Sequence, residues 1–397
     1  MPSSSRRRFL STTAAMGLAS FAGCSQSCSP RRTQYTTDLS LKGGQWPSRY
    51  YDATNANYNS GGSGPVGGVQ VAWRYTTCGP SNASTTVQDG LAYFERHTLD
   101  AQTGESTTTW ETDAELTPTV VDGTVYARTP NLEARDATTG EVRWTYEIGN
   151  APSPTAPAVS NGTAYAAGGS LYAVDSETGE RRWAFQPPTT LATMPAVSEQ
   201  TVYVASESRM LYAVDTETGD TRWETGHEQT GGPRIEATVA NGLVYFVANS
   251  DTGTVRAYEP TDGSIAWEQT TGVSTGACLA VTESTIFLAG RRSDNGIVLA
   301  LDAANGDPKW LSELTESNAL ATVSVGRENV YTGSSVGGDE ASVYALGRES
   351  GELRWEFATR SRDFGDYSEA KITGVAIVDE YVFVTTSGEV YALVEQS

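Results

Sequence analysis

The sequence predicts an all-β protein built from a repeated unit of four short strands, and three observations lead to this. Glycine makes up 40 of the 397 residues, and turn-forming residues recur every ten or so positions with few sustained helical periods between them. One phrase ending in tryptophan is written several times along the chain. A second, valine-rich phrase recurs in step with the first, and such a fixed period identifies the building unit.

The first phrase reads "LYAVDSETGERRW" up to Trp183 and "LYAVDTETGDTRW" up to Trp223. Further copies end at Trp144, Trp267, Trp310 and Trp355, and a copy two residues longer ends at Trp110. An eighth copy is split, because "VYALVEQS" at the C-terminus supplies its front half and "VQVAWRY" with Trp73 supplies its back half. Both ends of the chain are therefore expected in one unit.

The second phrase is a valine-rich run followed by a tight turn and an aromatic residue. It occurs eight times, from "VQDGLAY" at Tyr93 to "IVDEYVF" at Phe383, and several copies carry the Asp-Gly or Asn-Gly pairs that favour hairpin turns. Each unit is thus predicted to be an antiparallel meander of strands A to D. Small sheets of this kind cannot cover their own faces and stack radially into a β-propeller. We predict eight blades, the last taking strands A to C from the C-terminus and strand D from residues near Trp73.

The repeated residues have structural roles in this interpretation. Asp175 can accept hydrogen bonds from the turn amides, and Gly179 can adopt the left-handed conformation that the turn requires. The carboxylates at Asp136, Asp175, Asp215, Glu259 and Asp302 are therefore interpreted as turn residues and not as a metal or catalytic set. The tryptophans are expected to be buried where neighbouring blades dock, at Trp73, Trp110, Trp144, Trp183, Trp223, Trp267, Trp310 and Trp355.

The order Ala, Asp two residues on, Gly four further and Trp four after that resembles the tryptophan-docking repeat of pyrroloquinoline quinone (PQQ)-type propellers. The pattern fits in full at Ala134, Ala173 and Ala213, and the resemblance covers residues 68–397. It implies an eight-bladed propeller with each tryptophan docked on a neighbouring blade. The stretch "WPSRYYDATNANYN" from Trp46 is similar to the segment that precedes the first blade in many such proteins.

This family includes two very different kinds of protein. Quinoprotein dehydrogenases bind PQQ and calcium over the central channel and oxidise alcohols or sugars with an aspartate base. Non-catalytic members include the propeller lipoprotein of the bacterial outer-membrane assembly machine and many exported archaeal proteins. This chain has no adjacent cysteine pair, and no segment matches the calcium ligands or the catalytic aspartate. The sequence thus favours a non-catalytic scaffold with no cofactor and no metal site, since His97 and His227 are its only histidines.

Two alternatives remain open at this stage. One is a PQQ- and calcium-dependent dehydrogenase, in which Arg234 or Lys371 would face the quinone carboxylates. The other is a glycan-binding propeller that uses exposed aromatic side chains.

The N-terminal region carries targeting signals. Residues 1–23 are similar to a twin-arginine signal peptide with Arg6 and Arg7 as the pair, and "FAGC" resembles a lipobox with Cys24 as the lipidated residue, although Phe21 departs from the usual aliphatic residue. We expect export and anchoring at the outer face of the cell membrane. Residues 24–67 are predicted to be a flexible tether in which 46–59 pack on the propeller, and 68–397 the propeller itself.

The charge is strongly one-sided, with 48 acidic residues against 27 Lys and Arg, of which only Lys42, Lys309 and Lys371 are lysines. Nucleic acid is therefore excluded as a partner. A surface of this kind is typical of proteins from very salty surroundings, although an ordinary acidic secreted protein is the alternative. We expect a monomer that touches the membrane through its lipid anchor alone and binds a protein or cell-envelope component.

Topology indicates where that partner would bind. The A–B and C–D turns share one face, the turn face, while the longer B–C and D–A connections share the other, the loop face. The D–A connection after Trp355 is the longest. The candidate partner-binding residues on the loop face are Arg234, Arg291, Arg292, Asp294, Arg360, Arg362, Asp363, Tyr367 and Lys371. The alternative is that they pair with surrounding acids. Cys78 and Cys278 are expected to be free thiols.

Overall fold

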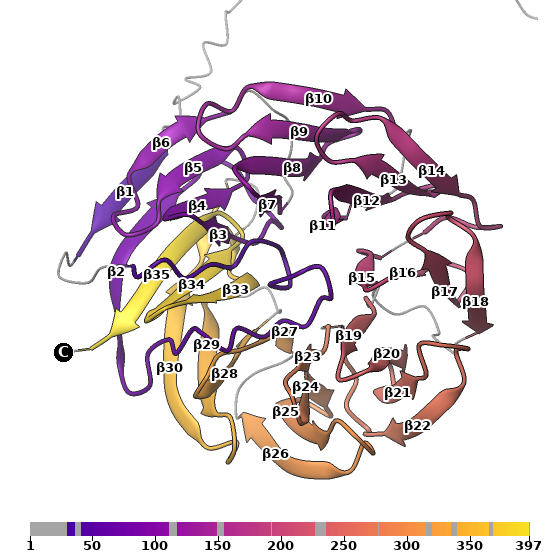
Figure 1. Ribbon diagram of the computed structural model, residues 1–397. Helices are drawn as coiled ribbons and strands as arrows, with labels where there is room; N and C mark the ends of the chain where they lie inside the picture. Colours follow the sequence, from indigo (N-terminus) through magenta and orange to yellow (C-terminus); the bar gives the residue numbers. More distant parts are fainter. Residues whose placement is uncertain are drawn as a thin grey trace, which may run out of the picture.

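A computed structural model describes residues 30–35, 41–110, 117–148, 155–191, 193–226, 236–276, 278–314, 320–334, 340–364 and 368–396. In these ranges every regular element is a β-strand, and the strands form a ring of eight radial blades around a central channel (Figure 1). The prediction of an all-β, eight-bladed propeller is confirmed. Nowhere in the described ranges is there a helix long and apolar enough to cross a membrane.

Seven blades are sheets of four strands, which follow one another in chain order. Blade 1 contains β3 (Thr86–Gln88), β4 (Leu91–Phe94), β5 (His97–Asp100) and β6 (Ser106–Thr109). Blade 2 contains β7 (Thr119–Val121), β8 (Thr124–Arg128), β9 (Leu132–Asp136) and β10 (Val142–Tyr146). Blade 3 contains β11 (Ala158–Ser160), β12 (Thr163–Ala167), β13 (Leu171–Asp175) and β14 (Arg181–Phe185). Blade 4 contains β15 (Ala196–Ser198), β16 (Thr201–Ala205), β17 (Met210–Asp215) and β18 (Thr221–Gly226).

Blades 5 to 7 are built in the same way. Blade 5 contains β19 (Thr238–Ala240), β20 (Leu243–Asn249), β21 (Thr254–Tyr258) and β22 (Ile265–Thr270). Blade 6 contains β23 (Ala280–Val281), β24 (Thr285–Arg292), β25 (Asn295–Asp302) and β26 (Pro308–Leu314). Blade 7 contains β27 (Leu320–Val325), β28 (Asn329–Ser334), β29 (Glu340–Gly347) and β30 (Leu353–Arg360). A short hairpin of β31 (Arg362–Asp363) and β32 (Ser368–Glu369) then leads to the last blade.

Blade 8 joins the two ends of the chain. Its strands A to C are β33 (Ile372–Val378), β34 (Tyr381–Thr386) and β35 (Glu389–Glu395), and β35 pairs antiparallel with β2 (Val69–Thr76), which serves as strand D. This is the closure that the split repeat predicted. A fifth strand, β1 (Arg31–Gln34), pairs with the outer edge of β2. The expected flexible tether between residues 24 and 67 therefore contains a strand, which is held by regular backbone pairing.

The hairpin turns between strands A and B follow from their sequence. Asp89 and Gly90 in blade 1 have φ angles of 51° and 76°, and Asn241 and Gly242 in blade 5 have 54° and 76°. Positive φ at both central residues defines the type I′ turn, which Asp-Gly and Asn-Gly pairs favour and whose twist matches that of the strands. The valine-rich strands are thereby placed innermost, around the channel.

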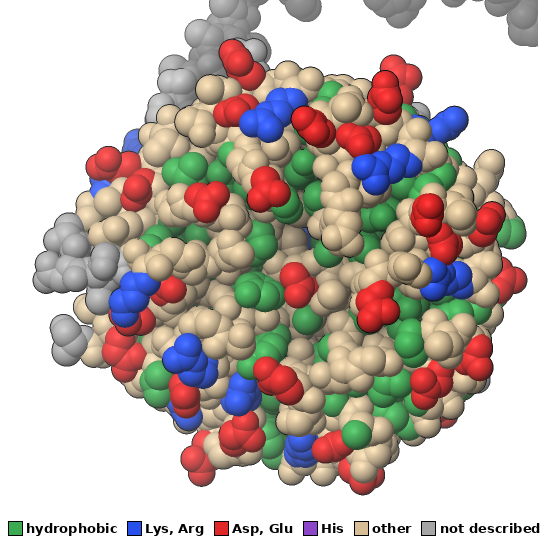
Figure 2. Space-filling model, in the orientation of Figure 1, with side chains coloured by type: hydrophobic (Ala, Val, Ile, Leu, Met, Phe, Trp, Pro, Cys, Tyr) green, Lys and Arg blue, Asp and Glu red, His purple; other side chains and the backbone are tan. Residues whose placement is uncertain are grey.

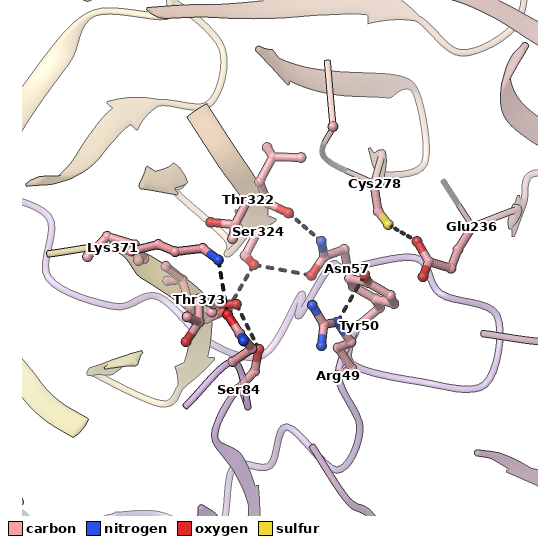
Figure 3. A pocket seen from close by; sticks show the side chains of 16 residues that line it. Arg49, Tyr50, Asn57, Ser84, Glu236, Cys278, Thr322, Ser324, Lys371 and Thr373 are labelled. Atoms are coloured by element: carbon pink, nitrogen blue, oxygen red, sulfur yellow. Dashed lines mark hydrogen bonds between the residues drawn. The ribbon is translucent and has the colours of Figure 1, made fainter. Parts of the chain in front are cut away.

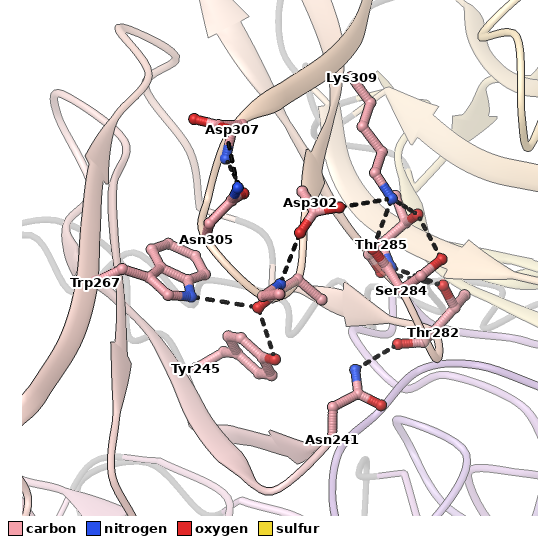
Figure 4. Close-up of polar contacts among 12 residues, drawn as sticks. Asn241, Tyr245, Trp267, Thr282, Ser284, Thr285, Asp302, Asn305, Asp307 and Lys309 are labelled. Carbon is pink, nitrogen blue, oxygen red and sulfur yellow. Dashed lines mark hydrogen bonds and ion pairs between the residues drawn. The ribbon is translucent and has the colours of Figure 1, made fainter.

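Neighbouring blades dock through the repeated tryptophan. Trp183 of blade 3 is 8% exposed and donates from Nε1 to the Thr216 carbonyl in the C–D turn of blade 4, at 2.8 Å. Gly219 of the same turn lies against the indole, where an added Cβ would come within 2.8 Å of Trp183 Cδ2. The same arrangement links blades 5 and 6 (Figure 4), where Trp267 donates to the Ala303 carbonyl at 3.2 Å.

The turn acids support this docking. Asp175 Oδ1 accepts from the amides of Glu177 and Thr178 at 3.1 and 2.9 Å, and its Oδ2 lies 2.7 Å from Arg182. These contacts hold the pKa of Asp175 down at about 2, chiefly through Arg182. The carboxylate is thus occupied by its own turn and is not available as a metal ligand.

Residues 46–59, here called the strap, run across the centre of the ring (Figure 1). Trp46 exchanges two backbone hydrogen bonds with Val87 of blade 1, at 2.7 and 2.8 Å. Further along, the strap accepts hydrogen bonds from the first residue of the valine-rich phrase in blades 2, 4, 5, 6 and 7, namely from the amides of Val120, Val197, Val239, Val281 and Val325. Because these valines precede the A–B turns, the strap lies across the channel on the turn face.

Candidate functional site in the central channel

A cavity of about 200 Å³ lies in the channel, on the inner side of the strap (Figure 3). Arg49, Tyr50 and Asn57 of the strap form one wall. The other walls come from strand A of several blades, or from the residues just before it, including Ser84, Glu236, Cys278, Ser324 and Thr373. Since strand A begins at the loop face, the cavity lies between the strap and that face.

Two cations line this cavity. Arg49 donates from Nε to the Tyr50 hydroxyl at 3.0 Å, and Lys371 donates from Nζ to Asn82 Oδ1 at 3.0 Å. Both side chains are half-buried. Within the part of the chain that the structure describes, neither forms an ion pair with a carboxylate. The cavity therefore holds positive charge inside a chain whose net charge is −21.

One acid, Glu236, is found among the described residues that line the cavity, and it already has a partner. Glu236 is 8% exposed, and its Oε2 accepts a hydrogen bond from the Cys278 thiol at 2.6 Å. Burial raises the pKa of the Cys278 thiol well above its usual value, and burial likewise raises the pKa of the Tyr50 phenol. Both groups remain protonated near neutral pH, so Cys278 is not an activated nucleophile.

Hydroxyl and amide groups make up most of the remaining wall. Ser84 Oγ donates to the Thr373 carbonyl at 2.9 Å, and Ser324 Oγ donates to the Val375 carbonyl at 2.8 Å. Asn57 donates through its side-chain amide to the Val323 carbonyl. Thr322 Oγ1 is buried and has no hydrogen-bond partner. The wall thus offers fixed oxygens, of which one hydroxyl is unpaired.

The structure distributes the predicted loop-face residues over separate blades. Arg291 and Arg292 end β24 of blade 6 and are exposed, as is Asp294 in the following turn. Arg360 ends β30 of blade 7 and is exposed, and Asp363 of β31 is exposed as well. Arg234 and Tyr367 lie outside the described residues.

Two of the predicted residues are oriented inward. Arg362 donates to the carbonyls of Thr77 and Gly388 at 2.8 and 2.9 Å, and its guanidinium lies 5.3 Å from the ring centroid of Phe364. It joins the last connection to blade 8 and is half-buried. Lys371 lines the cavity. Sequence reasoning missed Arg49, Tyr50, Glu236 and Cys278, and the resemblance of the strap to a pre-blade segment was the one signal that could have directed attention there.

The cysteine predictions have mixed outcomes. Cys278 is a free, buried thiol, as expected. Cys78 is disulfide-bonded, so the expectation of a free thiol at that position is wrong. Proposed lipidation at Cys24 and the export pair Arg6 and Arg7 fall outside the described residues.

Calcium does not fit this donor set. A calcium ion takes six to eight oxygen ligands and is usually held by several carboxylates. Among the described residues that line the cavity, Glu236 is the one carboxylate, and it already accepts a hydrogen bond from the Cys278 thiol. In the described ranges no group of three or more His, Cys, Asp or Glu side chains could hold a metal. The two cations could face quinone carboxylates, but the described lining residues include no carboxylate set for a calcium centre and no aspartate that could serve as a base.

The repeat region matches the family model described as outer membrane protein assembly factor BamB, over residues 73–250 and again over 167–397. The chain belongs to this family. No curated protein matches its sequence. The BamB match covers all eight docking tryptophans, and the residues that line the cavity from the blades lie within it.

Solved structures of both kinds of relative are similar to this propeller. BamB from Moraxella catarrhalis is 16% identical with a TM-score of 0.62, covering 82% of this chain and 100% of its own. Quinohemoprotein alcohol dehydrogenase from Comamonas testosteroni is 15% identical with a TM-score of 0.69, covering 89% and 81%. A europium-containing methanol dehydrogenase is 12% identical with a TM-score of 0.68, covering 88% and 98%. At these identities the likeness shows the fold and leaves the function to the site.

Proposed function

We propose that this member of the BamB family is a non-catalytic, exported propeller that binds a protein or cell-envelope partner through its loop face. The chain would be exported through Arg6 and Arg7, processed as a lipoprotein of the archaeal, salt-adapted type, and anchored at the outer face of the membrane by Cys24. The observation that carries the non-catalytic part is the channel itself, where Glu236 is the one acid among the described lining residues and already accepts a hydrogen bond from the Cys278 thiol.

The geometry of the two faces supports the choice of the loop face. The strap lies across the channel on the turn face, where the repeated turns are short and uniform. The loop face carries the connections that differ in length, together with the exposed Arg291, Arg292 and Arg360. Figure 2 has the orientation of Figure 1 and shows Asp and Glu side chains spread over the face that the strap crosses, with a hollow at its centre. Arginine pairs well with carboxylate or phosphate groups, so the partner would present acidic groups.

Site-specific photo-crosslinking in intact membranes tests the partner-binding surface. A photoreactive amino acid placed at Arg291 or Arg360 should capture one defined product, while the same group at Gln200 should capture none, because Gln200 is exposed in the A–B turn of blade 4 on the opposite face. Replacing the two remaining loop-face arginines by glutamine should weaken the product. Equal capture from both faces would contradict the proposal.

The dehydrogenase alternative has its own test. Purified mature protein is incubated with PQQ and calcium in high salt, and quinone absorbance and dye reduction are followed with a panel of alcohols and sugars. We expect no turnover, because the calcium ligands and the aspartate base have no residues in the channel. Stoichiometric binding with turnover would replace the scaffold proposal by an enzyme.

The glycan-binding alternative receives little support from the surface. It depends on exposed aromatic rings on which sugars could stack, and in the described ranges Tyr35, at 58% exposed, is the one strongly exposed aromatic side chain. A single ring beside β1 does not make a stacking platform.

A further inference from the structure

The channel cavity contains two half-buried cations that the fold does not need for its own ion pairs. Elsewhere in the chain, arginines of the repeat are paired with turn acids, as Arg182 is with Asp175 at 2.7 Å and Arg222 with Asp215 at 2.6 Å. Arg49 and Lys371 instead have a phenol and an amide as neighbours. Glu236 is the one carboxylate among the described residues that line the cavity with these two cations, so an excess of positive charge remains there. Partly buried charge of this kind is unfavourable unless an anion shares the site.

An anion that balances these two cations would have to lie inside the cavity and not on the protein surface. Arg49 comes from the strap and Lys371 from the start of β33, so two distant parts of the chain bring their charges to one space (Figure 3). Glu236 contributes one negative charge that attracts Arg49, but its Oε2 accepts the hydrogen bond of the Cys278 thiol and it forms no ion pair with either cation in the described ranges. Salt screens the attraction between charges less in a half-buried cavity than at an open surface.

The other residues of the cavity wall indicate which kind of molecule would carry the anionic group. Ser84, Ser324 and Thr373 each present a hydroxyl that donates to a backbone carbonyl and still has lone pairs to accept with. Thr322 Oγ1 has no hydrogen-bond partner. Fixed oxygens around two cations suit a small molecule rich in hydroxyl groups. The volume of about 200 Å³ is below the roughly 300 to 1,000 Å³ of pockets for drug-sized ligands.

We propose that the central cavity is a metal-free binding site for a small, hydroxyl-rich organic oxyanion, about one sugar ring in size, whose carboxylate or phosphate lies between Arg49 and Lys371. This site is independent of the partner-binding surface on the loop face, and either can fail without the other.

Calorimetric titration of the mature protein with three matched sugars tests the site. Glucuronate carries a carboxylate, glucose 6-phosphate carries a phosphate, and glucose carries no charge on the same ring. We expect one or both acids to bind with one-to-one stoichiometry, without added metal, at least tenfold more tightly than glucose. Binding of one acid alone identifies the group that the site takes. Glucose binding as tightly as both acids, or no heat from either acid, would overturn the proposal.

Variants separate the cavity from the general charge of the protein. Arg49→Gln and Lys371→Met should each weaken the acids at least tenfold, and Arg49→Lys should retain part of the binding because it keeps the charge without the planar fork. Arg181→Gln is the matched control, since Arg181 is exposed on β14 far from the channel lining. Each variant is first shown to melt cooperatively. Unchanged affinity in folded Lys371→Met and Arg49→Lys, or an equal loss in Arg181→Gln, would show that the cavity is not the site.

Discussion

A tryptophan is buried both between blades 3 and 4 and between blades 7 and 8, but the acceptor for its indole N–H comes from different parts of the chain. Trp183 donates to Thr216 in the C–D turn of the next blade. In blade 8 strand D is β2, which precedes strand C by most of the chain, so no C–D turn joins them, and Trp355 donates instead to the Pro65 carbonyl at 3.0 Å. Ordinary junctions are thus encoded within the repeat, whereas the junction between blades 7 and 8 depends on Pro65, which lies before the first repeat.

Removing those residues gives the largest expected effect. A chain that starts at Val69 loses the Pro65 acceptor, the strap and the buried Trp46, which is 1% exposed. We expect the free energy of unfolding to fall by at least about 5 kcal/mol, since loss of a buried tryptophan alone costs about 3 to 5 kcal/mol. Denaturant titration in one high-salt buffer measures it.

The matched control for this truncation is a chain that starts at Leu41, which lacks β1 but keeps the strap and Pro65. It should remain much closer to the full chain than the shorter one does. Identical unfolding midpoints for the two truncations would mean that closure does not depend on the strap.

The ordinary junction is tested by a pair of glycines with almost the same backbone. Gly219 has φ of +78° and lies against Trp183, whereas Gly242 has φ of +76° and has no atom within 4 Å of the Cβ position. Substitution by alanine should cost about 1 kcal/mol at Gly242 through left-handed strain. At Gly219 it should cost about 3 kcal/mol, because overpacking adds to the strain. Equal losses in thermal or denaturant unfolding would show that the indole contact does not limit this position.

A third junction, between blades 8 and 1, differs in its chemistry. At three junctions an aromatic residue two positions after the docking tryptophan pairs with a tyrosine of the next blade, as Phe185 does with Tyr212. Between blades 8 and 1 the pair is Tyr75 and His97, with Tyr75 Oη 3.2 Å from Nδ1. Burial lowers the pKa of His97 from 6.5 to about 4.

This shift predicts a pH dependence with a definite sign. As pH falls below about 6.5 the unfolded chain binds a proton at His97 before the folded chain does, so stability is lost progressively down to about pH 4 and is fully present above pH 6.5. At pH 5 the loss should be about 2 kcal/mol. His97→Tyr, which restores the pair found at the other junctions, should remove this part of the pH dependence. The difference between the two pH profiles measures it, and parallel profiles would contradict the assignment.

The sequence predicted the blades well because their signals are local. An Asp-Gly pair, a turn acid such as Asp175 and a tryptophan at fixed spacing each determine their own few residues, and repetition makes the pattern visible. The split copy also placed Trp73 in blade 8, because half a repeat at each end has one way to be completed.

The cavity and the strap could not be predicted in the same way, because their contacts join residues far apart in the chain. Arg49 lies in the segment 46–59 that the sequence predicted to pack on the propeller, but its position in the channel depends on backbone hydrogen bonds between the strap and valines of several blades. Arg362 was expected to face a partner, but its guanidinium finds carbonyls of Thr77 and Gly388, which only the folded blade brings within reach. The charge of such residues can be read from the sequence, but the direction in which their side chains point cannot.

The pairing of β2 with β35 has a consequence for biosynthesis. Strand β2 is made near the start of the chain, and its partner emerges roughly 320 residues later, which at about 5 to 20 residues per second takes on the order of 15 to 65 s. Throughout that time the ribosome carries a nascent ring with an unpaired strand edge, and unpaired edges invite association with other chains. Strand β1 covers only the outer edge of β2, so the inner edge stays open until β35 is made and completes the circle.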